Sequence, residues 1–281
     1  MRTLLSVVAA LVVLIVAGLV LAVVLVLKDR STGPKQPAGQ SSVSTTDQTP
    51  GAAASSAPPS GNAAAAALDP AQVASAVDPW LVQLTIKRPA GATATGNGIV
   101  LTSDGQFVAN DHLVDGALSI MGTVGSPGNN HTYTANVVGH DSTRDTALLQ
   151  LQGASGLQTP TFGVSATVSP GQPVIAVGHA PAAGAAPAMI PGIVLAVGQR
   201  VPATDPDSES KMLRGVIQIY ALVQPEDNGG PVVNSAGQII GVLVAEAASL
   251  QTQSAVPVAY AIPIRTAMRS VQQIREGSTQ G

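Results

Sequence analysis

The residues of this chain that could carry out covalent chemistry occur in a fixed order between His112 and Pro231. His112 comes first, Asp145 follows, and a turn of Gly229, Gly230 and Pro231 comes last. In acyl transfer a serine hydroxyl attacks a carbonyl, a histidine accepts the proton and a buried aspartate orients the imidazole. Backbone amides near the nucleophile stabilise the oxyanion, which is why glycine-rich backbone accompanies it. This order of residue types therefore indicates the parts of an acyl-transfer site.

Short extended segments must position these residues, because most apolar stretches have the length of strands. The stretches cover residues 81–86, 98–101, 106–109, 146–151, 174–177, 193–197, 238–244 and 258–262. Gly, Pro, Asn and Ser separate many of them, and β-branched residues are frequent within them. This pattern predicts an all-β fold, a barrel or a sandwich.

Helical patterns occur only at the two ends of this part of the chain. One face of residues 264–276 collects the apolar side chains Ile264, Met268, Val271 and Ile274. Gly277 then follows as a stop signal, so we expect a final helix packed on the β structure. A shorter helix is predicted to begin near Asp69 and Pro70, because aspartate suits the N-cap and proline the first helical position.

Seven blocks of the sequence occur in the order and spacing of one enzyme family. They are residues 96–100, 107–117 (FVANDHLVDGA), 137–151, 173–178, 191–194, 237–241 and 261–264. Through them, residues 75–275 resemble chymotrypsin-like serine proteases of the bacterial HtrA kind. The resemblance implies two antiparallel six-stranded β-barrels, an active site in the cleft between them, His112 as general base and Asp145 as orienting acid. No sequence remains after the final helix for the peptide-binding PDZ module of many such proteases, so we expect none.

The segment that should carry the nucleophile departs from this family. The family has Gly, a polar residue, Ser, Gly, Gly and Pro, whereas residues 226–231 read EDNGGP. By this resemblance Asn228 occupies the serine position, and Glu226 replaces a glycine whose amide helps to form the oxyanion hole. A carboxamide has no proton that a histidine can remove to make a nucleophile. Glu226 would repel an oxyanion and fits poorly where the backbone favours glycine, so we expect no peptide hydrolysis.

Other interpretations exist for the residues of this site. Asp141 competes with Asp145, although the Thr-Ala-Leu-Leu that follows Asp145 favours the latter. Asn228 also suits a tight Asn-Gly turn with no chemical role. Ser235 is a conceivable substitute nucleophile, but it lies in an Asn-Ser-Ala-Gly turn that needs no functional explanation.

Composition excludes several other classes of function. Aromatic residues make up 2% of the chain and the formal net charge is -3, which argues against a nucleic-acid-binding module. The absence of cysteine excludes disulfides, thiolate metal sites and a cysteine nucleophile. The remaining histidines, His131, His140 and His179, are too scattered to indicate a metal site. We expect no metal and no cofactor.

The chain divides into four parts by composition. We expect a cytoplasmic stub (residues 1–3), a transmembrane anchor (4–27), a disordered Ala/Pro/Ser-rich linker (28–68) and a trypsin-like protease-fold domain (69–281). As a helix the uncharged apolar run would be about 36 Å long, enough to cross a hydrocarbon core of about 30 Å. A cleaved signal peptide is the alternative, but the run is longer than such a segment needs and no small-residue cleavage motif precedes Lys28.

The orientation of the anchor is predicted from the resemblance. Arg2 lies on one side of the run and Lys28, Arg30 and Lys35 on the other, and this count of cations would favour the opposite topology. The resemblance places the domain outside the cytoplasmic membrane, with a single pass.

Three functional hypotheses follow. The first is a membrane-anchored extracytoplasmic homologue of serine proteases that is catalytically inactive and binds a peptide or protein partner in the inter-barrel cleft. The second is an active HtrA-like serine endopeptidase of the cell envelope. The third is a structural domain whose cleft is unused, for which changes at His112 and Asp145 would alter only stability.

Overall fold

The computed structural model describes residues 70–126, 128–180, 185–203, 211–244 and 257–277. The predicted stub (1–3), anchor (4–27) and linker (28–68) lie outside these residues. Within the described part of the chain, none of the helices combines the length and the apolar character needed to cross a bilayer.

The first half of the described chain forms a six-stranded antiparallel sheet. Its strands are β1 (Leu81–Lys87), β2 (Thr93–Val100), β3 (Gln106–Ala109), β4 (Ser119–Ser126), β5 (Asn129–Asp141) and β6 (Thr146–Leu151). Their order is β1-β2-β3-β6-β5-β4, and β4 pairs with β1, so the sheet closes on itself. Closure leaves no unpaired edge strand.

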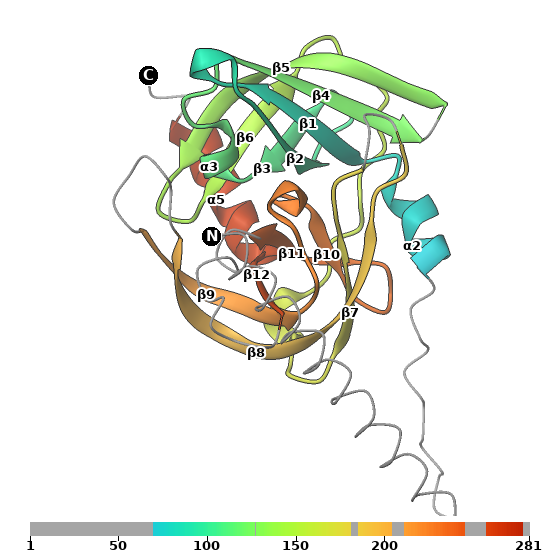
Figure 1. Cartoon of the computed structure of the whole chain (residues 1–281), viewed down its shortest axis with the longest axis vertical. Helices are drawn as coiled ribbons and strands as arrows, with labels where there is room; N and C mark the ends of the chain where they lie inside the picture. Colours follow the sequence, from blue (N-terminus) through green and yellow to red (C-terminus); the bar gives the residue numbers. More distant parts are fainter. Residues whose placement is uncertain (1–69, 127, 181–184, 204–210, 245–256, 278–281) are drawn as a thin grey trace, which may run out of the picture. The chain divides into compact units, whose positions relative to one another are not determined.

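The second half repeats this architecture with different strand lengths (Figure 1). Its strands are β7 (Pro173–Val177), β8 (Met189–Ala203), β9 (Lys211–Tyr220), β10 (Pro231–Val233), β11 (Ile239–Val244) and β12 (Val258–Pro263). Their order is β10-β11-β12-β9-β8-β7, and β7 pairs with β10. The predicted all-β fold of two six-stranded antiparallel sheets is therefore confirmed.

Helical segments are short and lie outside the sheets. They are α2 (Pro70–Val77), α3 (Asp111–Val114), α5 (Ile264–Gly277) and the 3-10 turns η1 (Pro89–Gly91), η2 (Ser165–Thr167) and η3 (Pro225–Asp227). The predicted C-terminal helix is confirmed as α5, which contacts β5 and β6 of the first sheet and β11 and β12 of the second (Figure 1). It buries Ile264, Val271 and Ile274 and so connects the two halves.

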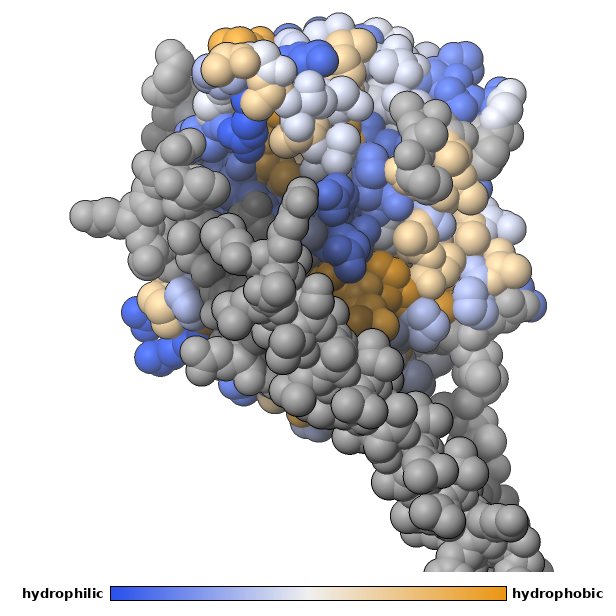
Figure 2. Space-filling view, in the orientation of Figure 1, coloured by the Kyte–Doolittle hydropathy of each residue, from blue (hydrophilic) through white to orange (hydrophobic). Residues whose placement is uncertain are grey.

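Each sheet encloses apolar side chains. Leu84 and Phe107 are fully buried in the first, and Ala176 and Ile219 in the second. The drawn face of the described residues mixes hydrophilic and apolar areas, and the broadest strongly apolar area lies below the centre of the view (Figure 2). Burial of the inward-facing positions of both sheets is the main contribution to the stability of this fold.

The structure differs from the sequence predictions mainly in four strands that were not predicted. β3 and β6 have the predicted bounds, whereas β4, β5, β9 and β10 have no counterpart among the predicted stretches. In β5 only Ala135 is buried, so its polar outer residues hide it from a search for apolar runs. β8 spans Met189–Ala203 and so extends beyond both ends of the stretch predicted over residues 193–197.

Candidate functional site

His112 lies in the one-turn helix α3, immediately after β3. The Arg88 guanidinium covers the C-terminal end of α3 and donates to the carbonyl oxygens of His112 (2.9 Å), Leu113 (3.0 Å) and Asp115 (3.0 Å). A cation at this end of a helix satisfies carbonyl groups that have no partner within the helix. The His112 side chain is 13% exposed. Arg88 thus anchors the backbone that carries the imidazole.

Asp145 lies in the turn between β5 and β6 and faces His112. His112 Nδ1 is 2.9 Å from each of its carboxylate oxygens, and the His112 backbone N–H donates to Oδ1 at 3.0 Å. The Asn110 side chain donates to Oδ2 at 3.0 Å. Asp145 is 5% exposed and has a φ of 49°, a conformation that few residues with a Cβ adopt. The carboxylate can only accept, so the proton lies on Nδ1 and leaves Nε2 as the basic nitrogen.

Asp141, the alternative to Asp145 in the sequence, stabilises the β5–β6 turn through hydrogen bonds instead. Its Oδ2 accepts from Ser270 Oγ (2.6 Å) and from Arg144 Nη1 (2.7 Å), and Arg144 also donates to Gln273 (3.2 Å). Burial tends to raise the pKa of Asp141, but the hydrogen bonds from Ser270 and Arg144 outweigh it and hold the pKa below its usual range. Helix α5 therefore braces the turn that presents Asp145.

Asn228 lies on the loop between β9 and β10, directly after η3. Its backbone N–H donates to the Pro225 carbonyl (3.3 Å), and its side-chain Nδ2 donates to the same oxygen (2.9 Å). Its own carbonyl accepts from the Asn97 backbone N–H of β2 (2.8 Å). Asn228 is 1% exposed. Both of these donor groups thus point into the loop's own turn.

Asp227 holds this turn in place, whereas Glu226 faces solvent. The buried Asp227 carboxylate accepts from the backbone N–H groups of Gln224 (2.7 Å) and His179 (2.8 Å). Its own N–H donates to the Gln224 carbonyl (2.9 Å). Glu226 lies between Pro225 and Asp227 in the sequence, and its side chain is exposed.

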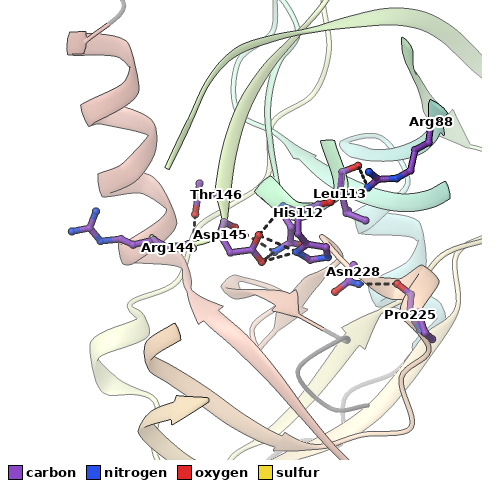
Figure 3. A network of polar contacts seen from close by, with 9 residues as sticks. Arg88, His112, Leu113, Arg144, Asp145, Thr146, Pro225 and Asn228 are labelled. Carbon is purple, nitrogen blue, oxygen red and sulfur yellow. Dashed lines mark hydrogen bonds and ion pairs between the residues drawn. The ribbon is translucent and has the colours of Figure 1, made fainter. Parts of the chain in front are cut away.

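Two glycines allow the loop to approach the rest of the protein closely. A Cβ on Gly229, whose φ is +79°, would lie 2.0 Å from the Asn97 carbonyl oxygen, and one on Gly230 would lie 1.9 Å from that of Val177. The same position on Gly229 is 3.5 Å from Asn110 Oδ1, which places the loop beside the group around Asp145. In Figure 3 the His112 ring lies between the Asp145 carboxylate and Asn228. Glycine is required here for both conformation and space.

The structure thus brings the four sequence-predicted site residues, His112, Asp145, Glu226 and Asn228, to the junction of the two sheets. Ser235 lies in the turn at the other end of β10, where Ala236 N–H and Gln238 N–H donate to Asn234 Oδ1. That turn needs no further role for the serine.

The other histidines occupy different surroundings. His131 and His140 lie in β5, and His140 Nδ1 is 3.0 Å from the buried carboxylate of Asp111. His179 Nδ1 is 3.2 Å from the Gly96 carbonyl oxygen, and its backbone N–H donates to the Asp227 carboxylate. No pattern in the sequence distinguishes His179 from the rest, because its partners come from distant segments.

Asn97, Asn110 and Arg88 are site neighbours that the sequence did not reveal. Asn97 lies within β2 and Asn110 directly follows β3; both are fully buried polar residues next to apolar ones, and only that contrast could have drawn attention to them. Arg88 acts on backbone carbonyls, for which no sequence signal exists.

A hollow of about 580 Å³ lies elsewhere, between α5 and the β5–β6 turn. Its polar groups include Asp141, Arg144 and Ser270, which already bond to one another. It does not include His112 or Asn228. The arrangement of chemical groups therefore identifies the candidate site better than the size of a hollow does.

A family model described as the trypsin-like peptidase domain matches residues 96–242. The chain is 33% identical over 183 residues to Serine protease Do-like HtrA of Lactobacillus helveticus, covering 64% of this chain and 42% of that protein. It is 31% identical over 215 residues to Serine protease PepD of Mycobacterium tuberculosis, covering 72% and 46%. The chain thus spans less than half the length of these relatives.

Solved structures show the same fold. The HtrA-type protease AlgW with tripeptide aligns with a TM-score of 0.60 and 23% identity, over 73% of this chain and 63% of that one. The AlgWS227A form with tripeptide aligns with a TM-score of 0.60 and 24% identity.

Proposed function

This chain belongs to the trypsin-like peptidase domain family, among its HtrA-like members, and from that premise we propose that it binds a peptide or protein partner without hydrolysing it. Asn228 is the observation that carries the proposal. It takes the place of the nucleophile and uses its amide groups within its own loop.

The arrangement of His112 and Asp145 supports the proposal that this site still binds a partner. His112 and Asp145 are in hydrogen-bond contact, buried, and supported by Asn110 and Arg88. A pair in this geometry can remove a proton from a hydroxyl beside Nε2. At the nucleophile position the chain offers a carboxamide, which has no such proton to give. Loss of the nucleophile from a serine protease lowers kcat by about 10⁶.

The second half of the site lacks the arrangement that stabilises an oxyanion. The Asn228 N–H donates to the Pro225 carbonyl, so it is directed away from a substrate oxygen. Glu226 adds a negative charge to the same turn. Loss of one oxyanion donor costs about 3 kcal/mol of transition-state stabilisation. The two changes are independent and both oppose acyl transfer.

We propose further that residues 4–27 anchor the protein in the cytoplasmic membrane, with the domain on the extracytoplasmic side. The uncharged apolar run and the linker that follows it support this location. A reporter that is active only outside the cytoplasm, fused after residue 281, tests it. An active reporter supports the proposed topology, and an inactive reporter that is expressed and folded contradicts it.

Hydrolysis is tested with the full chain in detergent and an unstructured protein substrate such as casein. The natural chain, His112→Ala, Asn228→Ser and the His112→Ala/Asn228→Ser double variant are compared. We expect no cleavage by the natural chain. Cleavage by the natural chain that disappears in His112→Ala would show an active endopeptidase and overturn the proposal.

A further inference from the structure

The hydrogen-bond donors of the loop before β10 are turned inward. Asn228 N–H and Nδ2 both donate to Pro225, and the Asp227 N–H donates to the Gln224 carbonyl. In an acyl-transfer enzyme, donors in this segment point outward to bind a negatively charged oxygen. The groups that would make this end of the site attractive to an anion are thus occupied by the loop itself.

The groups that remain are acceptors. Glu226 presents an exposed carboxylate on η3. Asn97 and Asn110 lie beside the same loop, and their Oδ1 atoms are buried and accept no hydrogen bond from the residues that the structure describes. Asn97 Nδ2 is directed at the Glu226 and Asn228 carbonyl oxygens (3.4 Å each), which leaves its Oδ1 as the uncompensated end of the amide. Uncompensated oxygen atoms in a region of low dielectric give a negative local potential.

Carboxylates outnumber permanent cations around the site. Asp145, Asp227 and Glu226 contribute three carboxylates. The neighbouring groups that can be positive are the His112 and His179 rings and the Arg88 guanidinium, which is directed at the carbonyl oxygens of α3. With neutral imidazoles the described groups therefore carry a net negative charge, and Glu226 is the exposed member that a ligand can reach.

From these observations we infer that this end of the site accepts a primary ammonium group on the bound peptide, from a lysine side chain or a free amino terminus. The inference rests on the proposed function, because it names the chemistry of the ligand for the same surface. An ammonium group supplies three donors and a positive charge to a surface that offers acceptors and a carboxylate.

The test measures binding of four peptides to the full chain in detergent by fluorescence anisotropy. The peptides share one neutral sequence, an amidated C-terminus and an uncharged fluorophore. Three are acetylated and carry norleucine, lysine or glutamate at the central position. The fourth carries norleucine and a free amino terminus. Lysine and the free amino terminus thus separate the two sources of the ammonium group.

We expect the lysine peptide, the free-amine peptide or both to bind about threefold more tightly than the acetylated norleucine peptide, as for a solvent-exposed charge pair. The glutamate peptide should bind more weakly than norleucine. Glu226→Gln should remove the preference. The matched variant Glu276→Gln removes the same charge from the exposed surface of α5 and should keep it.

Equal binding of all four peptides, tighter binding of the glutamate peptide, or binding of none would overturn the inference. A preference that survives in Glu226→Gln would do so as well. Cleavage of the peptides is followed in the same samples. Cleavage by the natural chain would defeat the proposed function, whereas a charge preference without cleavage would support both.

Discussion

Two buried aspartates, one from each half of the molecule, are equally shielded but differently used. Asp145 and Asp227 are each 5% exposed. Asp145 accepts from an imidazole, a side-chain amide and a backbone N–H, so it orients a group that can transfer a proton. Asp227 accepts from two backbone N–H groups, so it fixes the path of a loop. Burial alone does not reveal whether a carboxylate serves chemistry or shape.

The two sheets that carry Asp145 and Asp227 differ in the same way. The first sheet keeps a histidine and an aspartate in contact, with Asn110 and Arg88 as supports. The second supplies the loop of Glu226 and Asn228, which by our proposal take the positions of a glycine and a serine in an active site of this family. We therefore expect that replacing Glu226 and Asn228 by glycine and serine allows His112 and Asp145 to support peptide hydrolysis.

The largest effect is expected from repair of both altered positions. Glu226→Gly/Asn228→Ser should cleave casein at least about 100-fold faster than Asn228→Ser alone, because the glycine allows the turn to open and expose its amides. Initial rates at equal folded concentration give the measurement. Adding His112→Ala should abolish the gain. Equal rates for the single and double variants would show that Glu226 does not limit the oxyanion site.

Close approach of the loop to the first sheet should make Gly229 the most sensitive position for stability. Gly229→Ala places a Cβ 2.0 Å from the Asn97 carbonyl oxygen at a φ of +79°. We expect a loss of about 4 kcal/mol or more in the free energy of unfolding. Gly237→Ala is the control, since its φ is +70° but the space is open, and it should cost about 1 kcal/mol. Similar losses in urea titrations would contradict the close contact.

The two aspartates should respond differently to the same substitution. Asp227→Asn removes one of two acceptor oxygens from buried N–H groups and should cost about 2 kcal/mol of stability. It should leave the His112 Nδ1 proton signal in the NMR spectrum unchanged. Asp145→Asn should shift or remove that signal. If Asp227→Asn shifts the signal equally, the two halves are coupled rather than distinct.

The smallest effect concerns the brace between α5 and the β5–β6 turn. Burial raises the pKa of Asp141, but hydrogen bonds from Ser270 and Arg144 lower it further, so the net shift is downward. The charged form therefore stabilises the fold above the ordinary pKa of about 4 and loses this effect as pH falls through the lowered value. Asp141→Asn should cost about 1 kcal/mol at pH 7, limited by solvent screening.

The pH dependence of the stability difference between the natural chain and Asp141→Asn tests whether the pKa of Asp141 is lowered. Unfolding of the natural chain and of Asp141→Asn is followed from pH 7 downwards, and the gap should close below about pH 4. Asp115→Asn, which changes an exposed carboxylate near α3, provides the matched control. A gap that widens on acidification would contradict the assigned shift.

Sequence patterns predicted elements whose own residues form apolar runs of four residues or more, but they missed the three-residue strand β10. β3 and β6 have the expected bounds, and α5 starts at the expected residue, because their buried faces are continuous in the sequence. β5 was missed, since only Ala135 of its residues is buried and its pairing depends on backbone hydrogen bonds with β4 and β6. The fold class was still predictable, because turn residues and strand-length runs recur along the whole domain.

Residue types and their order determined the candidate chemistry of this protein. They indicated His112 and Asp145, and they led us to expect that Asn228 occupies the position of the nucleophile. The tertiary structure decided which partners these residues have. Arg88, Asn97, Asn110 and His179 reach the site from segments far apart in the chain, and Asn97 of the first sheet donates to the Asn228 carbonyl oxygen. Hydrogen bonds act over about 3 Å, so only a folded chain can specify them.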